Sequence, residues 1–409
     1  MKKFLGVTLG ILTAIGGFVD IGDIVANAES GARFGLALAW VVIVGVVGIV
    51  IYAEMAGRVA AVSGRATFDI VRERLGARAA FANLFASFFI NFLTLVAEIA
   101  GVAIAVQLLS GIDYLIWIPV AAFAVWMVVW RVRFESMERI FGLLGLALIV
   151  FAVAVVKLGP DWGDLLHQAT HPSVPKGEGH PSYLFFAIAL FGAAMTPYEV
   201  FFFSSGAVEE HWSQDDLRLN KANVYIGFPL GGLLSLALMA ATAIVLQPKG
   251  ISITHLSMVT LPVMESLGKA GLAFVLLGIF AATFGAALET GLSAGYTVAQ
   301  FFGWPWGKFV RPRQAPRFYL VVLGSLIAAA LVGLTAVDPV KVTEYSIVLS
   351  AAALPLTYFP LLVVANDRDY MGDEVNGRFV NVVATIYLAI LLVVAVITIP
   401  LMIATKAGA

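Results

Sequence analysis

The segment FVDIGDIVANAES (Phe18–Ser30) places two carboxylates inside an apolar stretch that begins at Phe4. Asp20 and Asp23 flank Gly22, and at i and i+3 they would share one face of a helix. Like charges this close repel each other unless a cation lies between them. Gly22 weakens a helix by about 1 kcal/mol relative to alanine, and an unwound turn would free backbone carbonyl groups as further oxygen ligands. The spacing predicts a cation site, with a protonated carboxyl pair bonded to neighbouring helices as the alternative.

A second interruption lies in FGAAMTPYEVFFFSS (Phe191–Ser205), where Thr196 and Glu199 stand on either side of Pro197. Proline removes one helical hydrogen bond and clashes with the preceding turn. A proline kink alone also occurs in inert helices. Two broken spans with carboxylates nearby are typical of inverted-repeat transporters, whose substrate site lies at mid-membrane between the broken helices.

Three further acids lie in apolar runs, where an unpaired charge costs at least about 3 kcal/mol and therefore usually faces a cavity. Glu54 precedes Arg58 by four residues, which predicts an ordinary helix ion pair. Glu98 has no charged neighbour in sequence and is a candidate for a proton path. Glu289, in GAALETGLSAGY, lies among small residues that permit close helix packing, and it either lines the cavity or bonds a neighbouring helix.

The composition indicates a membrane protein. Of 409 residues, 61% are hydrophobic and only 12% are charged, and the mean hydropathy is +0.95. A soluble domain carries about 25% charged residues. The apolar runs do not alternate, which favours helices over a barrel. The absence of cysteine excludes disulfides and thiolate chemistry. No nucleophile–base pair, phosphate-binding loop or zinc-helix motif occurs, so we expect no enzyme, no cofactor and no nucleic-acid partner.

The apolar runs predict eleven membrane-spanning helices in one transporter domain over residues 1–409. One repeat covers about 4–158, a second about 181–365, and an extra helix follows at 379–404. Most of the 25 lysines and arginines fall on one side of this arrangement, which predicts a multi-pass protein of the cytoplasmic membrane with its N-terminus in the cytoplasm. Lys2 and Lys3 imitate a signal peptide, but the long run that follows indicates a retained helix. The predicted spans are 4–28, 35–57, 79–109, 114–131, 139–158, 181–207, 222–247, 269–300, 317–336, 341–365 and 379–404.

The longest polar stretch, Pro160–Pro181, contains His167, His171 and His180. Three histidines in a loop rich in proline and glycine could bind a metal, but we expect a solvated outer loop. The expected partners are the lipid bilayer and the transported ion. The sequence leaves the oligomeric state open, with a monomer as one possibility.

Several motifs together resemble the Nramp family of proton-coupled divalent-metal transporters over nearly the whole chain. The resemblance implies an all-α fold of the LeuT type, with a 5+5 inverted repeat, one extra helix, and helices 1 and 6 broken. The motifs are DIGDIVANAESGARFG (20–35, like the DPGN helix), AEIAGVAIAVQLLSGI (97–112, third helix), PDWGDLL (160–166, outer loop), MTPYE (195–199, in place of MPH), ETGLSAGYTVAQ (289–300, eighth helix) and VLSAAALPLTYFPLLVVANDRDYMGDEVNGRFVN (348–381, tenth helix and the loop after it).

The resemblance implies metal ligands at Asp20, Asp23, Thr196 and the backbone carbonyl of Ala193. Relative to the family, asparagine has become Asp23 and methionine has become Thr196. A soft thioether favours transition metals, whereas carboxylate and hydroxyl oxygens suit hard cations. The site has therefore lost its softest ligand and gained negative charge.

Two further departures concern the family's histidine and asparagine after the proline, which are Tyr198 and Glu199 here. The third helix keeps Glu98, but Leu95 replaces an earlier acid. We therefore expect a transporter of a hard divalent cation, Mg²⁺ first and Mn²⁺ or Ca²⁺ next, with weak or absent proton coupling.

Two rival interpretations remain open. A LeuT-type symporter could bind an amino acid or organic amine at the same carboxylates and Glu289, helped by cation–π contacts from Tyr198 and Phe201–Phe203. An Nramp-like sensor that does not transport is the second. The gain of charge at the site argues against a site that has lost its function.

Overall fold

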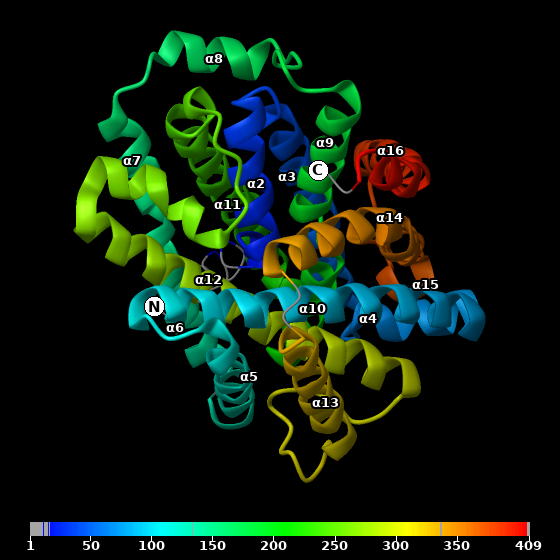
Figure 1. The fold of residues 1–409 in the computed structure, drawn as a ribbon. Coiled ribbons are helices and arrows are strands. Elements are labelled where there is room, and N and C mark those ends of the chain that lie inside the picture. The colour runs from blue at the N-terminus through cyan, green and yellow to red at the C-terminus, as the bar shows by residue number, and fades with distance from the viewer. Residues whose placement is uncertain (1–10, 12–14, 16, 133, 336–337, 407–409) are drawn as a thin grey trace.

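The computed structural model of the chain describes residues 11, 15, 17–132, 134–335 and 338–406. Within these ranges the regular structure is helical, as predicted (Figure 1). The helices are α2 (Ile21–Phe34), α3 (Ala39–Ser63), α4 (Thr67–Ser110), α5 (Tyr114–Arg131), α6 (Phe134–Gly145), α7 (Val150–Leu158), α8 (Trp162–Thr170), α9 (His180–Ala194), α10 (Pro197–Glu209), α11 (Leu217–Val245), α12 (Leu261–Phe302), α13 (Pro316–Gly333), α14 (Pro339–Ala365), α15 (Arg368–Met371) and α16 (Arg378–Ala404).

Ten helical segments in the described ranges are long and apolar enough to cross a membrane. They correspond to the second to eleventh predicted spans, and the span at 114–131 coincides with α5. Seven of them match within about six residues, but Thr67–Ser110, Gln214–Lys249 and Leu256–Phe302 begin 8 to 13 residues before the predicted spans. The first predicted span, 4–28, lies partly outside the described residues. In its described part, Gly17 and Phe18 are helical, and α2 follows and continues to Phe34.

Two glycines divide long helices at points where the backbone adopts a positive φ. Gly76 divides α4 with φ of +81°, and Gly268 divides α12 with φ of +65°. Only glycine adopts such a conformation without strain. The segments after the kinks, 77–110 and 269–302, correspond to the predicted spans 79–109 and 269–300. Residues 67–75 therefore form a separate short helix at one end of the bundle.

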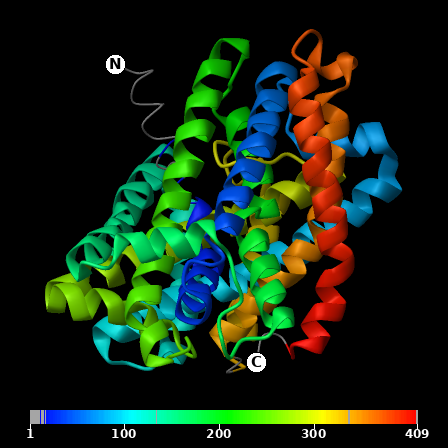
Figure 2. The same cartoon turned by 90° about the horizontal axis from the view of Figure 1, so that it is seen from above.

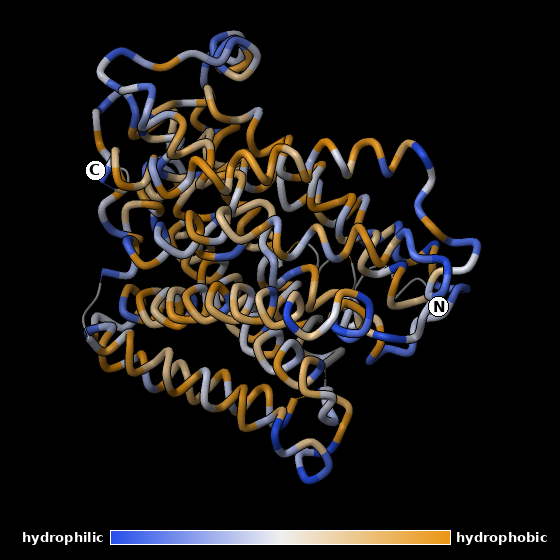
Figure 3. The backbone as a smooth tube through the Cα atoms, turned by 90° about the vertical axis from the view of Figure 1, so that its right-hand side faces the viewer, coloured by the Kyte–Doolittle hydropathy of each residue, from blue (hydrophilic) through white to orange (hydrophobic). Residues whose placement is uncertain are grey.

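Glycines at helix crossings allow the backbones to approach closely, as small residues do in membrane proteins. A Cβ atom on Gly101 of α4 would lie 2.5 Å from the side chain of Ile21, and one on Gly192 of α9 would lie 2.5 Å from the carbonyl oxygen of Ile347. These contacts bring α4 against α2 and α14 against α9. Figure 1 shows α2 near the centre of the bundle, and Figure 3 shows that hydrophobic residues dominate the helices.

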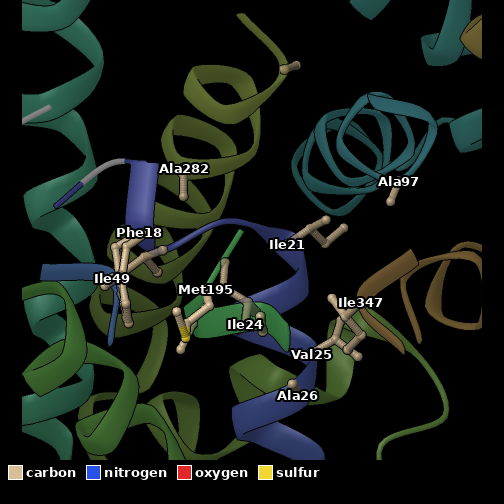
Figure 4. Close-up of a cluster of buried hydrophobic side chains, with 14 of the residues drawn as sticks. Phe18, Ile21, Ile24, Val25, Ala26, Ile49, Ala97, Met195, Ala282 and Ile347 are labelled. Carbon is tan, nitrogen blue, oxygen red and sulfur yellow. The ribbon is translucent and has the colours of Figure 1, made fainter. Parts of the chain in front are cut away.

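Apolar side chains surround the interruption before α2 (Figure 4). Phe18 and Ile21 on its two sides are 3% and 2% exposed. Figure 4 shows Phe18 beside Ile49, Met195 near Ile24, and Ile347 on the side of Ile21. The polar groups described below therefore lie in an otherwise apolar environment.

The predicted Glu54–Arg58 ion pair is confirmed, with 3.1 Å between Arg58 Nε and Glu54 Oε1. Arg58 also donates to Asn376 Oδ1 at 2.5 Å and to the carbonyl oxygen of Glu374. This arginine ties α3 to the loop between α15 and α16. Figure 2 shows α16 running along the rim of the bundle.

The stretch predicted to be an outer loop contains a helix, α8. Asp161 caps the start of this helix, because its side chain accepts a hydrogen bond from the Gly163 N–H at 2.8 Å. The rings of His167 and His171 stack with centroids 4.5 Å apart, and His180 is the first residue of α9. Across the described residues no group of three His, Cys, Asp or Glu side chains is arranged to hold a metal ion. The three histidines therefore form no metal site in this structure.

Candidate functional site at two broken helices

The first broken helix is interrupted at Val19 and Asp20, and it resumes at Ile21 as α2. Asp20 caps α2, because its Oδ1 accepts the Asp23 N–H at 2.8 Å. Glu98 Oε1, from α4, accepts the Ile21 N–H at 3.0 Å. The first N–H groups of a helix lack partners within it and carry partial positive charge. The start of α2 therefore stabilises two buried carboxylates.

Asp20 and Asp23 do not share a helix face, contrary to the prediction, because Asp20 lies outside the helix as its cap. Asp23 is directed toward α11, where its Oδ2 accepts the Ser235 hydroxyl at 2.5 Å. Its Oδ1 accepts the side-chain amide of Asn27 at 2.8 Å. Both aspartates are 1% exposed. The two acids therefore have separate hydrogen-bond partners, which stabilise each of them.

The second broken helix is interrupted at Met195 and Thr196, between α9 and α10. Pro197 is the first residue of α10, a position where a backbone N–H would have no partner within the helix, so proline removes no helical hydrogen bond there. Ala193 lies in the last turn of α9, whose carbonyl groups lack partners inside the helix. The predicted interruption at the proline is therefore confirmed. The sulfur of Met195 packs against α3, because a Cβ atom on Gly48 would lie 2.6 Å from it.

Tyr198 links the two interruptions. Its hydroxyl lies 3.0 Å from Asp20 Oδ2 and 3.1 Å from the carbonyl oxygen of Gly17, and it is the donor to both acceptors. The side chain is fully buried. One residue of α10 thus holds both sides of the interruption in the first helix.

Glu199 is the most weakly satisfied acid at this junction. It is 1% exposed, and no backbone N–H, hydroxyl, amide or cationic group of the described residues donates to its carboxylate oxygens. Its carboxyl group faces that of Glu289 from α12. A Cβ atom on Gly17 would lie 2.2 Å from Glu199 Oε2, so a larger residue there would displace the carboxylate. Two facing carboxyl groups must share a proton or a cation.

The acids Asp20, Glu98 and Glu199 form one electrostatic cluster, because Asp20 lies close enough to both glutamates for the charges to interact. In the described part of the chain, none of the three forms an ion pair with lysine or arginine. Glu98 is fully buried and its Oε2 has no hydrogen-bond partner there. The junction therefore concentrates carboxyl groups without a resident cationic side chain.

Most of these residues were predicted from the sequence, but Asn27, Ser235 and Gly17 were not. Ser235 stands alone among apolar residues in GLLSLALM, and an isolated hydroxyl in an apolar span was a detectable signal. Gly17 matters through its contacts with Glu199 and Tyr198, which no local pattern shows. Thr196 lies at the interruption as predicted and is 7% exposed.

Known proteins of one family are similar to this chain over most of its length. Residues 10–400 match the model of the family described as "Nramp: Natural resistance-associated macrophage protein-like". The chain is 27% identical over 374 residues to the divalent metal cation transporter MntH of Pectobacterium carotovorum, covering 89% of this chain and 87% of that protein. It is 25% identical to the MntH protein of Yersinia enterocolitica, with 92% and 90% covered.

Solved structures show the same fold. A manganese transporter of Eremococcus coleocola superposes with a TM-score of 0.74 at 20% identity, covering 99% of this chain and 88% of that one. The transporter MhsT, bound to L-phenylalanine, superposes with a TM-score of 0.64 at 16% identity, with 95% and 98% covered. Because the family match spans residues 10–400, this multi-pass membrane protein belongs to the Nramp family.

Proposed function

We propose that the chain transports a hard divalent metal cation, Mg²⁺ first and Mn²⁺ or Ca²⁺ next, by alternating access across the cytoplasmic membrane. The observation that carries the proposal is the buried cluster of Asp20, Glu98 and Glu199 at the junction of two broken helices, which lacks a lysine or arginine partner. A buried negative cluster of this kind is stable only with protons or with a bound cation. The named relatives are divalent metal cation transporters, which supports the cation.

The proposed ligands are Asp20, Asp23, the Thr196 hydroxyl and the Ala193 carbonyl, with Tyr198 and Glu199 beside them. All are oxygen ligands, which suit Mg²⁺, Mn²⁺ and Ca²⁺. The Met195 sulfur is engaged with α3 and does not soften this set. Because Asp23 bonds Ser235 and Asn27 in this conformation, inner-sphere binding by Asp23 requires a second lone pair of one oxygen to face the ion, or one of these bonds to break. A water molecule retained by Mg²⁺ would avoid that rearrangement.

We further propose that proton coupling is weak or absent. Tyr198 stands in place of a titrating histidine, and Leu95 replaces an acid on α4. One oxygen of the remaining acid, Glu98, is bound to the Ile21 N–H at the start of α2. A pH-sensitive dye inside proteoliposomes would report the coupling. We expect metal uptake without stoichiometric acidification of the lumen, and stoichiometric acidification would overturn this part of the proposal.

The N-terminus lies in the cytoplasm in this proposal, because lysines and arginines concentrate on that side. The loop after α12 carries Lys308, Arg311 and Arg313, and the segment around Arg72 and Arg74 lies on the same side. The two halves, about 4–158 and 181–365, would move against each other around the junction. Protease accessibility of an N-terminal tag in oriented vesicles tests this orientation.

The proposal is tested by ion uptake into proteoliposomes with wild-type protein, Asp20→Asn and Glu265→Gln. Glu265 is the matched control, because it is an exposed acid paired with Lys249 far from the junction. We expect Mg²⁺ uptake to fall more than about tenfold in Asp20→Asn, as expected for loss of a charged ligand, and to stay unchanged in Glu265→Gln.

Two outcomes would contradict the ion preference and the substrate class. Cd²⁺ carried much better than Mg²⁺ and Mn²⁺ would exclude a hard-cation site. Uptake of a labelled amine or amino acid, dependent on Asp20 and unaffected by divalent ions, would favour the organic-substrate symporter. Equal loss of Mg²⁺ uptake in both variants would show that the assay reports general damage rather than the site.

A further inference from the structure

Buried polar side chains form a line along α4 below Glu98. Asn83, Ser87, Asn91 and Glu98 are all 1% exposed or less. At 3.6 residues per turn they fall within an arc of about 80°, and the line from Asn83 to Glu98 is about 22 Å long. This length exceeds half of a hydrocarbon core of about 30 Å. The stripe therefore runs from the mid-membrane acids toward the end of the bundle where residues 67–75 lie.

The polar groups of this stripe are incompletely satisfied. The Ser87 hydroxyl donates to Asn83 Oδ1 at 2.9 Å, but Asn83 Nδ2 has no partner among the described residues. Asn91 Nδ2 donates to Ser293 Oγ at 3.2 Å, and Asn91 Oδ1 likewise has none. Buried polar groups are nearly always hydrogen-bonded, by protein or by ordered water. Three orphaned groups on one helix face, counting Glu98 Oε2, indicate water along that face.

The stripe faces hydroxyl and amide groups of two other helices. Ser293 of α12 lies between Asn91 and the carbonyl oxygen of Tyr198, with 3.4 Å from its Oγ to that oxygen. Closer to the helix ends, Gln300 of α12 donates to the hydroxyl of Ser205 of α10 at 2.9 Å. The seam between α4, α10 and α12 is thus lined by neutral oxygen and amide groups. Such groups replace part of the hydration of an ion without trapping it.

Aromatic side chains close the seam near Leu84, which lies about 21 Å along α4 from Glu98. Phe68, Phe201 and Leu84 form a buried apolar cluster separate from the main core, packed against Phe88 and Phe301. The rings of Phe68 and Phe201 meet edge to face with centroids 5.3 Å apart.

Phe68 belongs to the short helix 67–75, which Gly76 separates from the rest of α4. Thr67 fixes this helix to α10 by two contacts with the Ser204 hydroxyl, both 2.9 Å. Arg72 of the same helix donates to the carbonyl oxygen of Phe301 in α12. The closure therefore rests on a segment with its own hinge.

We propose that the seam between α4, α10 and α12 is a hydrated passage for the divalent cation between the acid cluster and the lysine- and arginine-rich side, and that Phe68 and Phe201 close it in this conformation. The inference deepens the proposed function by naming the route from its site, and it rests on that function for the identity of the ion. Asn91 and Ser293 line the middle of the passage. Phe68 acts on the passage through its ring and does not bind the ion.

Cysteine accessibility tests the passage directly, because the chain has no cysteine of its own. Single variants Asn91→Cys and Ser293→Cys in full-length protein in proteoliposomes are treated with a cationic, membrane-impermeant methanethiosulfonate from each side separately. Val96→Cys is the matched control, since Val96 is 2% exposed and lies on the opposite side of α4. We expect Asn91→Cys and Ser293→Cys to react at least tenfold faster than the control from the lysine- and arginine-rich side. Adding Phe68→Ala should raise both rates several-fold.

The passage is refuted if Asn91→Cys and Ser293→Cys react no faster than Val96→Cys with and without Phe68→Ala, or if they react only from the other side. Because Asn91 and Ser293 come from different helices, either variant suffices if the other does not fold. The reaction rate does not depend on ion uptake. Failure of wild-type protein to carry Mg²⁺ would therefore overturn the proposed function, while the labelling would still decide whether the passage exists.

Discussion

Glu199 and Glu209 lie on the same helix, α10, and both are buried, but their surroundings differ. Glu209 Oε1 accepts the Tyr296 hydroxyl and the Lys308 N–H at 2.7 Å, and its Oε2 accepts the Phe309 N–H at 2.8 Å. Glu199 has no comparable donors and faces Glu289 instead. A carboxylate whose oxygens are taken by donors of its own chain stabilises the fold. A carboxylate that faces another acid, as that of Glu199 does, can still bind a cation from outside the chain.

Glu199→Gln should produce the largest functional effect that separates the two acids. Removing the charge should lower Mg²⁺ uptake more than about tenfold. The melting temperature without divalent ions should stay the same or rise, because repulsion from Glu289 and Asp20 is relieved. Uptake and thermal denaturation of the same preparation give both values. A lower melting temperature with normal uptake would show that Glu199 stabilises the fold instead.

Glu209→Gln should give the opposite pattern. Loss of the charged acceptor for two backbone N–H groups and a tyrosine should lower the free energy of unfolding by about 1–3 kcal/mol. Uptake per folded molecule should remain within about twofold of wild type, because Glu209 lies at the end of α10 away from the junction. Denaturation in detergent and uptake normalised to folded protein test this. A tenfold loss of uptake with unchanged stability would remove the distinction between the two acids.

Gly17→Ala should impair the junction through Glu199 alone. The added Cβ atom would lie 2.2 Å from Glu199 Oε2, so the carboxylate must move. We expect a several-fold loss of Mg²⁺ uptake, partly restored when Glu199→Asp shortens the side chain in the same molecule. The double-mutant comparison is the control for general damage. If Glu199→Asp restores nothing, the clash with Glu199 is not the cause of the loss.

A smaller effect concerns Lys308, in the loop between α12 and α13. Burial lowers the pKa of Lys308 from 10.5 to about 8, against the opposing attraction of Glu209. Between these values the unfolded chain holds the proton and the folded chain does not, so this group makes the free energy of unfolding rise with pH. The rise is less than the full shift implies, because the side chain is partly exposed. Lys308→Met should flatten the dependence of melting temperature on pH between about 8 and 10, and an unaltered slope would contradict this.

The sequence predicted features that depend on local pattern. The lengths of the apolar runs predicted the membrane-spanning helices, and Pro197 predicted the second interruption. The i, i+4 spacing predicted the ion pair between Glu54 and Arg58. The first interruption was predicted from Gly22, but the chain breaks before it and Asp20 becomes a helix cap.

Features that depend on contacts between distant segments could not be predicted in the same way. The partner of Asp23 is Ser235 on α11, and Glu98 binds the Ile21 N–H across 77 positions of sequence. Both follow from how helices pack against α2, which no local periodicity encodes. The helix α8 was missed because a nine-residue segment rich in polar residues resembles a loop.

The most direct test of the central claim is the position of Mn²⁺ in crystals of the protein, located by anomalous scattering. A bound ion is predicted at the junction, with the Asp20 carboxylate in its coordination sphere at roughly 2.0–2.6 Å and the Tyr198 hydroxyl displaced or retained beside it. Soaked crystals in which Asp20 still binds Tyr198, with no anomalous peak between the two broken helices at saturating Mn²⁺, would contradict the account.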